Sequence, residues 1–339
     1  MYLKTPTYRD TVNRMGICLC IMLALFNFSS GFWYGLCDLI ALFLPIRLQY
    51  LTDVLAETLY YLSCFILPAV LFIPLSRGRE REPIRWSIRM PSYFPLLILA
   101  ALAVTTAAAY INSGFLQLIR YPDLGNSYGG ATDASAIALF ITVSLAPAFC
   151  EELLFRGVIY GNLRRFGQPM AVLVSAILFA LMHENIAQIF YTFVAGILLA
   201  LCYELTDSIW CGIFLHLFNN LYSCVQEILI SRIGDRAYGI LYLCDGALLL
   251  VGAAAGVLVL LLYRKGRLIP APEKAPAEPE SLFGNFPTET RRPAVKPDRR
   301  TARREFFAPG MTVFVVLTLL SVALQLLLAY TYPYWGFDL

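Results

Sequence analysis

Apolar residues along this chain gather in blocks of about twenty, and short polar segments separate the blocks. A helix of about twenty apolar residues can cross the hydrocarbon core of a bilayer. The pattern therefore predicts an all-α fold: a polytopic integral membrane helical bundle with about eight or nine transmembrane helices. We expect these spans near residues 15–36, 54–76, 92–112, 134–155, 169–185, 187–204, 208–230, 239–263 and 310–331. The segment 33–50 either continues the first span or forms a helix at the membrane interface.

Composition agrees with a membrane protein. The chain has 339 residues, of which 59% are hydrophobic and 14% are charged, whereas a soluble domain has about 45–50% apolar and roughly 25% charged residues. The formal net charge of +3 is too small to indicate a nucleic-acid partner. The nine cysteines form no CxxC pair, so we interpret them as small buried hydrophobic residues and not as a disulfide framework or a zinc site.

The placement of basic residues predicts the orientation in the membrane. If the N-terminus is cytoplasmic and the spans alternate, all but four of the 26 Lys and Arg residues lie in cytoplasmic segments. Such a bias is the usual determinant of topology. We therefore expect a multi-pass protein of the cell membrane whose N-terminus and whose segment 264–308 are cytoplasmic. The exceptions are Arg47, Arg120, Arg232 and Arg236.

The same pattern divides the chain into five parts: N-terminal transmembrane helices (1–133), a core (134–230), a further transmembrane helix (231–263), a linker (264–308) and a C-terminal transmembrane helix (309–339). The linker is rich in Pro and charged residues, which is typical of a disordered segment. Its basic part, 291–304, is either simply solvated or in contact with anionic lipid headgroups.

Charged residues interrupt the core at F-C-E-E-L-L-F-R-G, residues 149–157. Glu152 and Arg156 are four positions apart, so on a helix they share a face and can form an ion pair. Glu151 is rotated by about 100° from Glu152 and is left available as a general base. The simpler alternative is a charged cytoplasmic helix end, because Arg164 and Arg165 follow within a few turns.

The only two histidines of the chain, His183 and His216, fall in the next apolar spans. His216 and Asn220 are also four apart and share a helical face. Three helices therefore offer Glu151, His183, and His216 with Asn220, which are the side chains of a hydrolytic site. A single histidine on an apolar face is more often a structural residue, but here both histidines follow the glutamate pair.

Three short motifs resemble those of the CPBP family, also called Abi, of intramembrane proteases. This family includes CAAX prenyl endopeptidases of type II and bacteriocin-processing enzymes. E-E-L-L-F-R from residue 151 is similar to the EExxxR motif, F-A-L-M-H from 179 to FxxxH, and H-L-F-N-N from 216 to HxxxN. A-P-A-F-C at 146–150, Gly157 and T-D-S-I-W at 206–210 also look like the family. Each motif alone is degenerate, but three in the correct order are specific. The resemblance covers about 134–225.

The resemblance implies hydrolysis of a peptide bond in a membrane-associated protein or peptide by an activated water within the membrane. By the same resemblance, Glu151 and His183 would hold and deprotonate the water, and His216 and Asn220 would donate hydrogen bonds to the developing oxyanion. The supporting residues would be Glu152, Arg156 and Phe179. Glu151, His183 and His216 also equal the ligand set of a catalytic zinc ion, so zinc and metal-free water activation are equally consistent.

Two other functions use the same residues. The first is a proton-coupled transporter, for which further polar residues in or near the spans would serve as a relay: Glu184, Glu204, Asp207, Glu227 and Asp245. The absence of an evident internal repeat argues against it. The second is a non-catalytic immunity or scaffold protein of the same family. The sequence H-E-N-I-A at 183–187 lacks the second histidine of the HExxH zinc motif. Prenylated CAAX proteins are substrates of only part of the family, so the resemblance does not define the substrate.

Overall fold

The computed structural model describes residues 6–45, 50–76, 81–88, 90–121, 140–268 and 296–331. In these residues every regular element is a helix, and the one β-bridge, between Trp86 and Ser208, is isolated. The helices of the N-terminal part are α1 (Tyr8–Phe28), α2 (Ser30–Ala41), α3 (Tyr50–Tyr61), η2 (Leu62–Ile66), α4 (Leu67–Leu75) and α5 (Phe94–Leu118). The helices of the core are η3 (Phe140–Leu145), α7 (Ala146–Glu152), η4 (Leu153–Tyr160), α8 (Gly161–Leu163), η5 (Arg164–Phe166), α9 (Gln168–Leu181), α10 (Ile186–Thr206) and α11 (Ile209–Ile233). They are followed by α12 (Arg236–Arg264), α13 (Arg299–Phe306) and α14 (Pro309–Thr331).

Seven helices in the described part are long and apolar enough to cross a membrane. They are Tyr8–Phe28, Leu51–Leu75, Phe94–Leu118, Ile186–Thr206, Ile209–Ile233, Arg236–Arg264 and Pro309–Tyr330. A further apolar helix, α9, has only 14 residues. The span expected at 134–155 is described from Phe140, and its helical segments continue without interruption to Leu163. The predicted fold, an all-α bundle that crosses the membrane several times, is confirmed.

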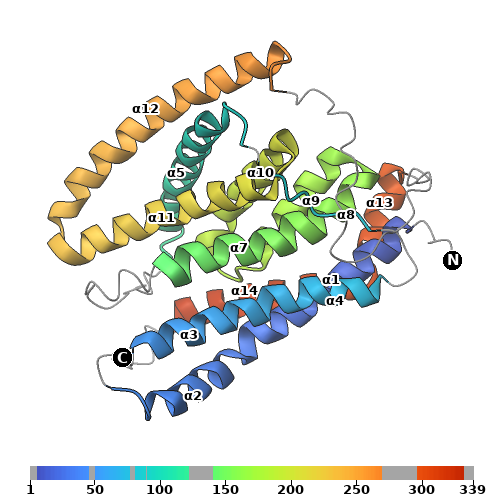
Figure 1. Cartoon of the computed structure of the whole chain (residues 1–339), viewed down its shortest axis with the longest axis horizontal. Coiled ribbons are helices and arrows are strands. Elements are labelled where there is room, and N and C mark those ends of the chain that lie inside the picture. Colours follow the sequence, from blue (N-terminus) through green and yellow to red (C-terminus); the bar gives the residue numbers. More distant parts are fainter. Residues whose placement is uncertain are drawn as a thin grey trace.

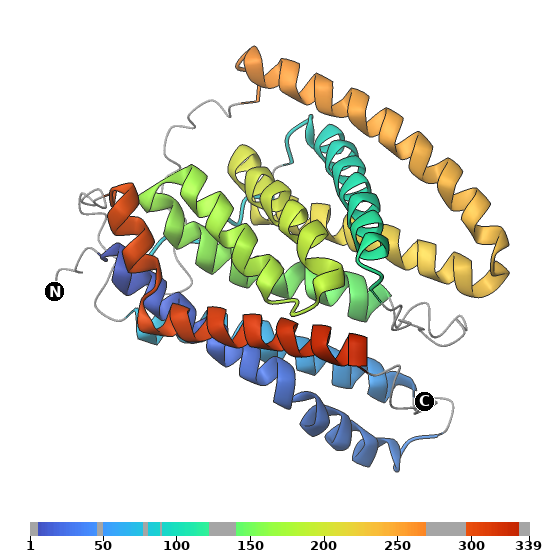
Figure 2. The ribbon, with the colours of Figure 1, turned by 180° about the vertical axis from the view of Figure 1, so that it is seen from behind.

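The helices form three layers (Figures 1 and 2). The core elements α7 to α11 make up the middle layer, the N-terminal helices α1 to α4 lie on one side with α14, and α5 packs with α12 on the other. The last helix is therefore an integral part of the bundle. It packs closely against α1 at Gly16, where a Cβ atom would lie only 2.1 Å from the backbone nitrogen of Met311. The close approach is possible because glycine has no side chain. Gly310 contributes to the same contact, since its backbone N–H donates to the Asn13 side chain at 2.8 Å.

Three boundaries differ from the sequence-based expectation. The first helix ends at Phe28 instead of near residue 36, and α2 is a separate helix after Ser29. Helix α9 ends at Leu181, so His183 lies in the turn after the helix and not within the span. Within the expected disordered linker, Arg299–Phe306 forms α13, because the Asp298 side chain caps its first turn by accepting from two backbone N–H groups. The linker residues 269–295 lie outside the described part.

The segments expected on the cytoplasmic side gather at one end of the bundle. The Tyr8 hydroxyl near the start of α1 contacts the Met170 sulfur at the start of α9, at 3.6 Å. In the same region, Arg165 forms an ion pair of 2.6 Å with Glu82. Helix α13 packs against α1 (Figure 1). The basic segments are thus neighbours in space as well as members of one predicted side.

Candidate active site

Both glutamates of the E-E pair lie at the end of α7, in the middle layer of the bundle. The helix then continues as the π-helical segment η4, a rare geometry that is frequently found at functional sites. Glu151 is 5% exposed, and Glu152 and Arg156 are completely buried. Charged side chains are almost never fully buried unless they are paired. Their partners therefore define the site.

Arg156 neutralises Glu152 in a buried ion pair. Its Nη1 lies 2.7 Å from Oε1 of Glu152, as the four-residue spacing predicted. Its Nη2 donates to the backbone carbonyl of Gly196 on α10 at 3.1 Å. The guanidinium also lies over the Phe179 ring, 4.5 Å from the ring centroid, a cation–π contact that contributes more when it is desolvated. Arg156 thus joins α7, α9 and α10.

His216 on α11 contacts both glutamates. Its Nδ1 lies 3.1 Å from Oε1 of Glu152. A carboxylate ion-paired with an arginine can only accept hydrogen bonds, so Nδ1 carries the proton. Its Nε2 faces Oε2 of Glu151 at 3.9 Å, which is too long for a direct hydrogen bond. The two atoms can instead share one small group, such as a water molecule, that bonds to both.

His183 lies on the other side of Phe179. Its Nδ1 is 2.8 Å from the Phe179 carbonyl, and because a carbonyl accepts, Nδ1 is again the protonated nitrogen. The Phe179 ring is 5.1 Å from the His183 ring and 5.9 Å from the His216 ring, with edge-on geometry in both pairs. Phe179 therefore orients both imidazoles and leaves the two Nε2 atoms available for chemistry.

Asn220 occupies the same face of α11 as His216, but its hydrogen bonds in the described structure are to residues other than the glutamates and histidines. Its Nδ2 donates to the backbone carbonyl of Val143 in η3 at 3.1 Å, and its Oδ1 is 3.4 Å from Nδ2 of Asn219. An amide has a second N–H, which stays available. The structure thus joins six candidates in one chain of contacts, with Asn220 one turn away on α11: Glu151, Glu152, Arg156, Phe179, His183 and His216.

The structure adds residues that sequence reasoning did not place in the site. Asn27, near the end of α1, donates to Oε2 of Glu184 at 2.9 Å. Glu184 is 6% exposed and has a positive φ of 49°, a conformation that is uncommon for residues other than glycine. This bond fixes the turn that carries His183. The signal in the sequence was an isolated asparagine within the first apolar block.

A glycine gives Glu152 its space on α11. A Cβ atom added at Gly212 would lie 3.0 Å from Oε2 of Glu152. In the described part, that Oε2 has no hydrogen-bond partner. Glu152 therefore fits closely between its own helix and α11.

The side chains do not form a ready metal site in this arrangement. No group of three His, Cys, Asp or Glu residues within the described ranges is placed to hold a metal ion together. In both histidines Nδ1 is hydrogen-bonded to the protein, which leaves Nε2 to bind either a metal ion or a water molecule. Because the three ligands do not converge, we derive no catalytic step through a metal.

Several acids proposed for a transporter relay have local partners. Glu204 accepts from the Tyr160 hydroxyl at 2.8 Å and lies 3.5 Å from Arg164. Asp207 forms an ion pair with Arg85, next to the isolated β-bridge. These residues stabilise one end of the bundle and do not form a chain toward the buried glutamates.

Comparison with known proteins finds similarity in the segment that carries this site. Residues 133–222 match the family model described as type II CAAX prenyl endopeptidase Rce1-like. A curated Bacillus subtilis (strain 168) protein, "Putative membrane peptidase YdiL", is 30% identical over 95 residues, which cover 27% of this chain and 39% of that protein. The chain therefore spans well under two thirds of the length of this curated relative. No solved structure matches the chain.

The fold and the site together define an integral membrane protein with a buried cluster of glutamate, arginine and histidine side chains. The segment 133–222, which contains the candidate catalytic and supporting residues named from the sequence, is similar to the Rce1-like family of type II CAAX prenyl endopeptidases.

Proposed function

We propose that this protein is an intramembrane endopeptidase that hydrolyses a peptide bond of a membrane-associated protein or peptide. The observation that carries the proposal is the approach of His216 Nε2 to Glu151 Oε2 at 3.9 Å in a buried site. Glu152 and Arg156 have already neutralised each other at 2.7 Å, so Glu151 is the acid left to act on a water molecule. The family match of the same segment agrees with this chemistry.

In the proposed reaction, a water molecule binds to Glu151 beside His216, and the Nε2 atom of His183 is its second partner. Glu151 takes a proton from the water as the hydroxyl oxygen attacks the carbonyl carbon of the scissile peptide. The same proton then passes from Glu151 to the nitrogen of the leaving amine, and the C–N bond breaks. His183 serves as an acceptor for the other water proton, since its Nδ1 proton is engaged by the Phe179 carbonyl.

His216 and Asn220 would stabilise the tetrahedral oxyanion. His216 would keep its Nδ1 hydrogen bond to Glu152 and direct its Nε2 toward the oxyanion. Asn220 supplies the second donor through the N–H that is not bonded to Val143. Removal of one such donor in other hydrolases slows the reaction by about 10²–10³-fold.

The proposed orientation places this chemistry near the cytoplasmic leaflet. Three basic segments lie together at one end of the bundle: the start of α1, α13 and the segment around Arg165. This arrangement supports the assignment of that end to the cytoplasm. On this assignment the N-terminus and the segment 264–308 are cytoplasmic.

The function is tested by incubating the purified full-length protein, reconstituted in liposomes, with two membrane-bound peptides. One peptide carries a prenylated CAAX end and the other an unmodified hydrophobic leader sequence. Mass spectrometry should detect a single cleavage site in at least one peptide. A variant with a matched remote change, Glu305→Gln on α13, should cleave at the wild-type rate. If neither peptide is cleaved but the same liposomes take up a small molecule in a protein-dependent way, the transporter alternative replaces this proposal.

A further inference from the structure

A second polar region lies between α5, α10, α11 and α12, away from the glutamate cluster. It is a cavity of about 290 Å³, and most of the residues that line it carry a hydroxyl, amide or carboxylate group. The polar residues that matter here are Tyr110, Ser113, Asn219, Tyr222, Gln226 and Asp245. Polar side chains inside a membrane protein usually line a path or a binding site, because they are unfavourable in contact with lipid.

Among the described residues that line this cavity, Asp245 on α12 is the only one with a charged side chain. Asp245 is 6% exposed, and in the described part of the chain no Lys, Arg or His forms an ion pair with it. Its partners are neutral donors. The Tyr110 hydroxyl donates to Oδ2 at 2.6 Å, Gln226 donates to Oδ1 at 3.2 Å, and the Tyr222 hydroxyl also donates to Oδ1.

These contacts leave the carboxylate one position open. Two carboxylate oxygens offer about four acceptor sites, and three donors occupy them here, two on Oδ1 and one on Oδ2. The space in front of Asp245 is the cavity itself. A buried negative charge with polar room beside it favours a positively charged hydrogen-bond donor.

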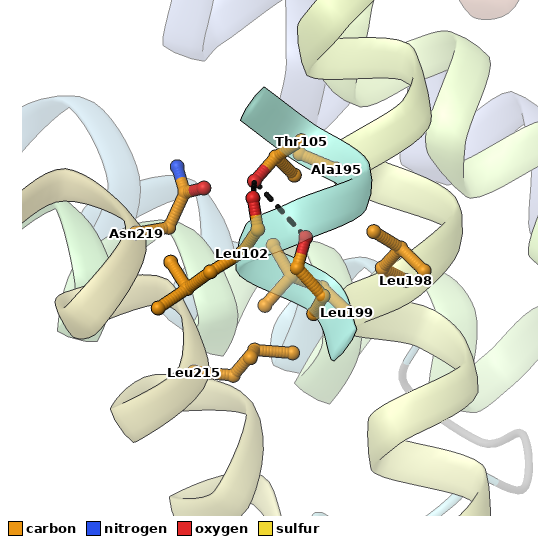
Figure 3. Close-up of a pocket in the computed structure, with 8 residues that line it drawn as sticks. Leu102, Thr105, Ala195, Leu198, Leu199, Leu215 and Asn219 are labelled. Carbon is orange, nitrogen blue, oxygen red and sulfur yellow. Dashed lines mark hydrogen bonds between the residues drawn. The ribbon is translucent and has the colours of Figure 1, made fainter. Parts of the chain in front are cut away.

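The cavity adjoins the proposed catalytic face of α11. Asn219, which lines it, is bonded to the Asn220 side chain at 3.4 Å. A smaller void of about 10 Å³ lies next to the cavity, and Thr105 and Asn219 line both spaces. Figure 3 shows these two residues on one side of that void, with Leu198, Leu199 and Leu215 around the rest. Because Asn219 and Asn220 are neighbours on α11, a peptide bound along this helix would lie beside both sites.

We propose that this cavity binds an ammonium or guanidinium group, supplied by a basic side chain of the substrate and held by Asp245 with Tyr110 and Tyr222 around it. The assignment of the group to the substrate rests on the proposed peptidase function. The cation site itself does not. It makes the enzyme selective for peptides with a lysine or arginine a few residues from the scissile bond.

The cation site is tested without catalysis. The unfolding temperature of the purified full-length protein is measured with n-butylammonium chloride and, in parallel, with n-butanol at the same concentration and ionic strength. The ammonium should stabilise the wild type and the alcohol should not. Asp245→Asn should abolish the difference, whereas the matched change Asp235→Asn, at the exposed start of α12, should keep it. Thr106→Trp, which fills the cavity without removing the carboxylate, should abolish it as well. Equal effects of ammonium and alcohol on the wild type would overturn the site.

The source of the cation is tested by peptide binding to the Glu151→Gln protein, which keeps peptides intact. A set of fluorescent membrane peptides carries one lysine at successive positions, and each is paired with the same peptide containing norleucine. At one position lysine should bind about tenfold more tightly or better, the scale of a hydrogen bond to a charged group. This gain should disappear with Asp245→Asn added and persist with Asp235→Asn. The substrate assignment would be refuted if no lysine peptide bound more tightly than its norleucine partner while butylammonium still stabilised the protein. The ligand would then be a free amine.

Discussion

Replacement of Arg156 by glutamine tests how the buried pair supports the site. Arg156→Gln removes the guanidinium that contacts Glu152 at 2.7 Å, and Glu152 stays completely buried. The fold then holds an uncompensated carboxylate, with His216 Nδ1 at 3.1 Å as its remaining donor. We therefore expect a large loss of stability from this single change.

The magnitude follows from the charges and from desolvation. At an effective dielectric constant of about 20, two unit charges 2.7 Å apart attract by roughly 6 kcal/mol. The desolvation of the guanidinium offsets part of that attraction. Loss of one partner from a buried pair typically destabilises by about 3–5 kcal/mol, and we expect Arg156→Gln to fall in this range.

Equilibrium unfolding in mixed detergent micelles measures the effect for the wild type, Arg156→Gln, Glu152→Gln and the double variant. The double variant removes both charges. Its loss in free energy of unfolding should therefore be smaller than the sum of the two single losses by at least about 2 kcal/mol. Arg236→Gln, at an exposed position at the start of α12, should change the free energy of unfolding by less than about 0.5 kcal/mol. Single losses below about 1 kcal/mol, or additivity within about 0.5 kcal/mol, would refute the reasoning.

Three further outcomes are expected. Gly212→Ala places a methyl group 3.0 Å from Oε2 of Glu152 and should lower the cleavage rate at least tenfold. The control Gly239→Ala, where the added Cβ atom meets no neighbouring atom within 4 Å, should leave the rate unchanged. Equal rates for the two variants would contradict the close fit at Glu152. Asn27→Leu removes the bond to Glu184 that fixes the His183 turn, so the rate constant at saturating peptide should fall with little change in KM, and an unchanged rate constant would exclude this positioning role. Replacement of the α13 arginines at 303 and 304 by glutamine should weaken binding of a peptide spanning 291–308 to anionic but not to neutral vesicles, as measured by co-sedimentation at low salt; equal binding to both vesicle types would exclude a lipid contact.

The sequence predicted the fold class and the ion pair because both depend on local periodicity. Blocks of about twenty apolar residues identify helices that cross the membrane, and a spacing of four brings Glu152 to Arg156 regardless of the rest of the fold. Local periodicity could not show that His216 lies near the glutamates, because this depends on the packing of α11 against α7; the expectation came from the combination of side chains and from the family motifs.

Contacts between distant segments were not predictable in this way. The bond from Asn27 to Glu184 joins the first helix to the turn after α9, 157 positions along the chain. The position of His183 outside its helix depends on that turn, which apolar periodicity does not register. Likewise, Asp245 was visible as a single polar residue, but its cavity forms from α5, α10, α11 and α12 together.

The central claim is that Glu151 activates the water molecule, and one measurement tests it most directly. The cleavage rate of a membrane peptide at saturation is compared between the wild type and Glu151→Gln, with Glu305→Gln as the control and with equal unfolding temperatures verified beforehand. Glutamine keeps the shape of the side chain but cannot accept the proton, and removal of a general base typically costs about 10²–10⁴-fold. We predict a rate at least 100-fold lower for Glu151→Gln and a wild-type rate for Glu305→Gln. A folded Glu151→Gln protein that cleaves at the wild-type rate would contradict the account.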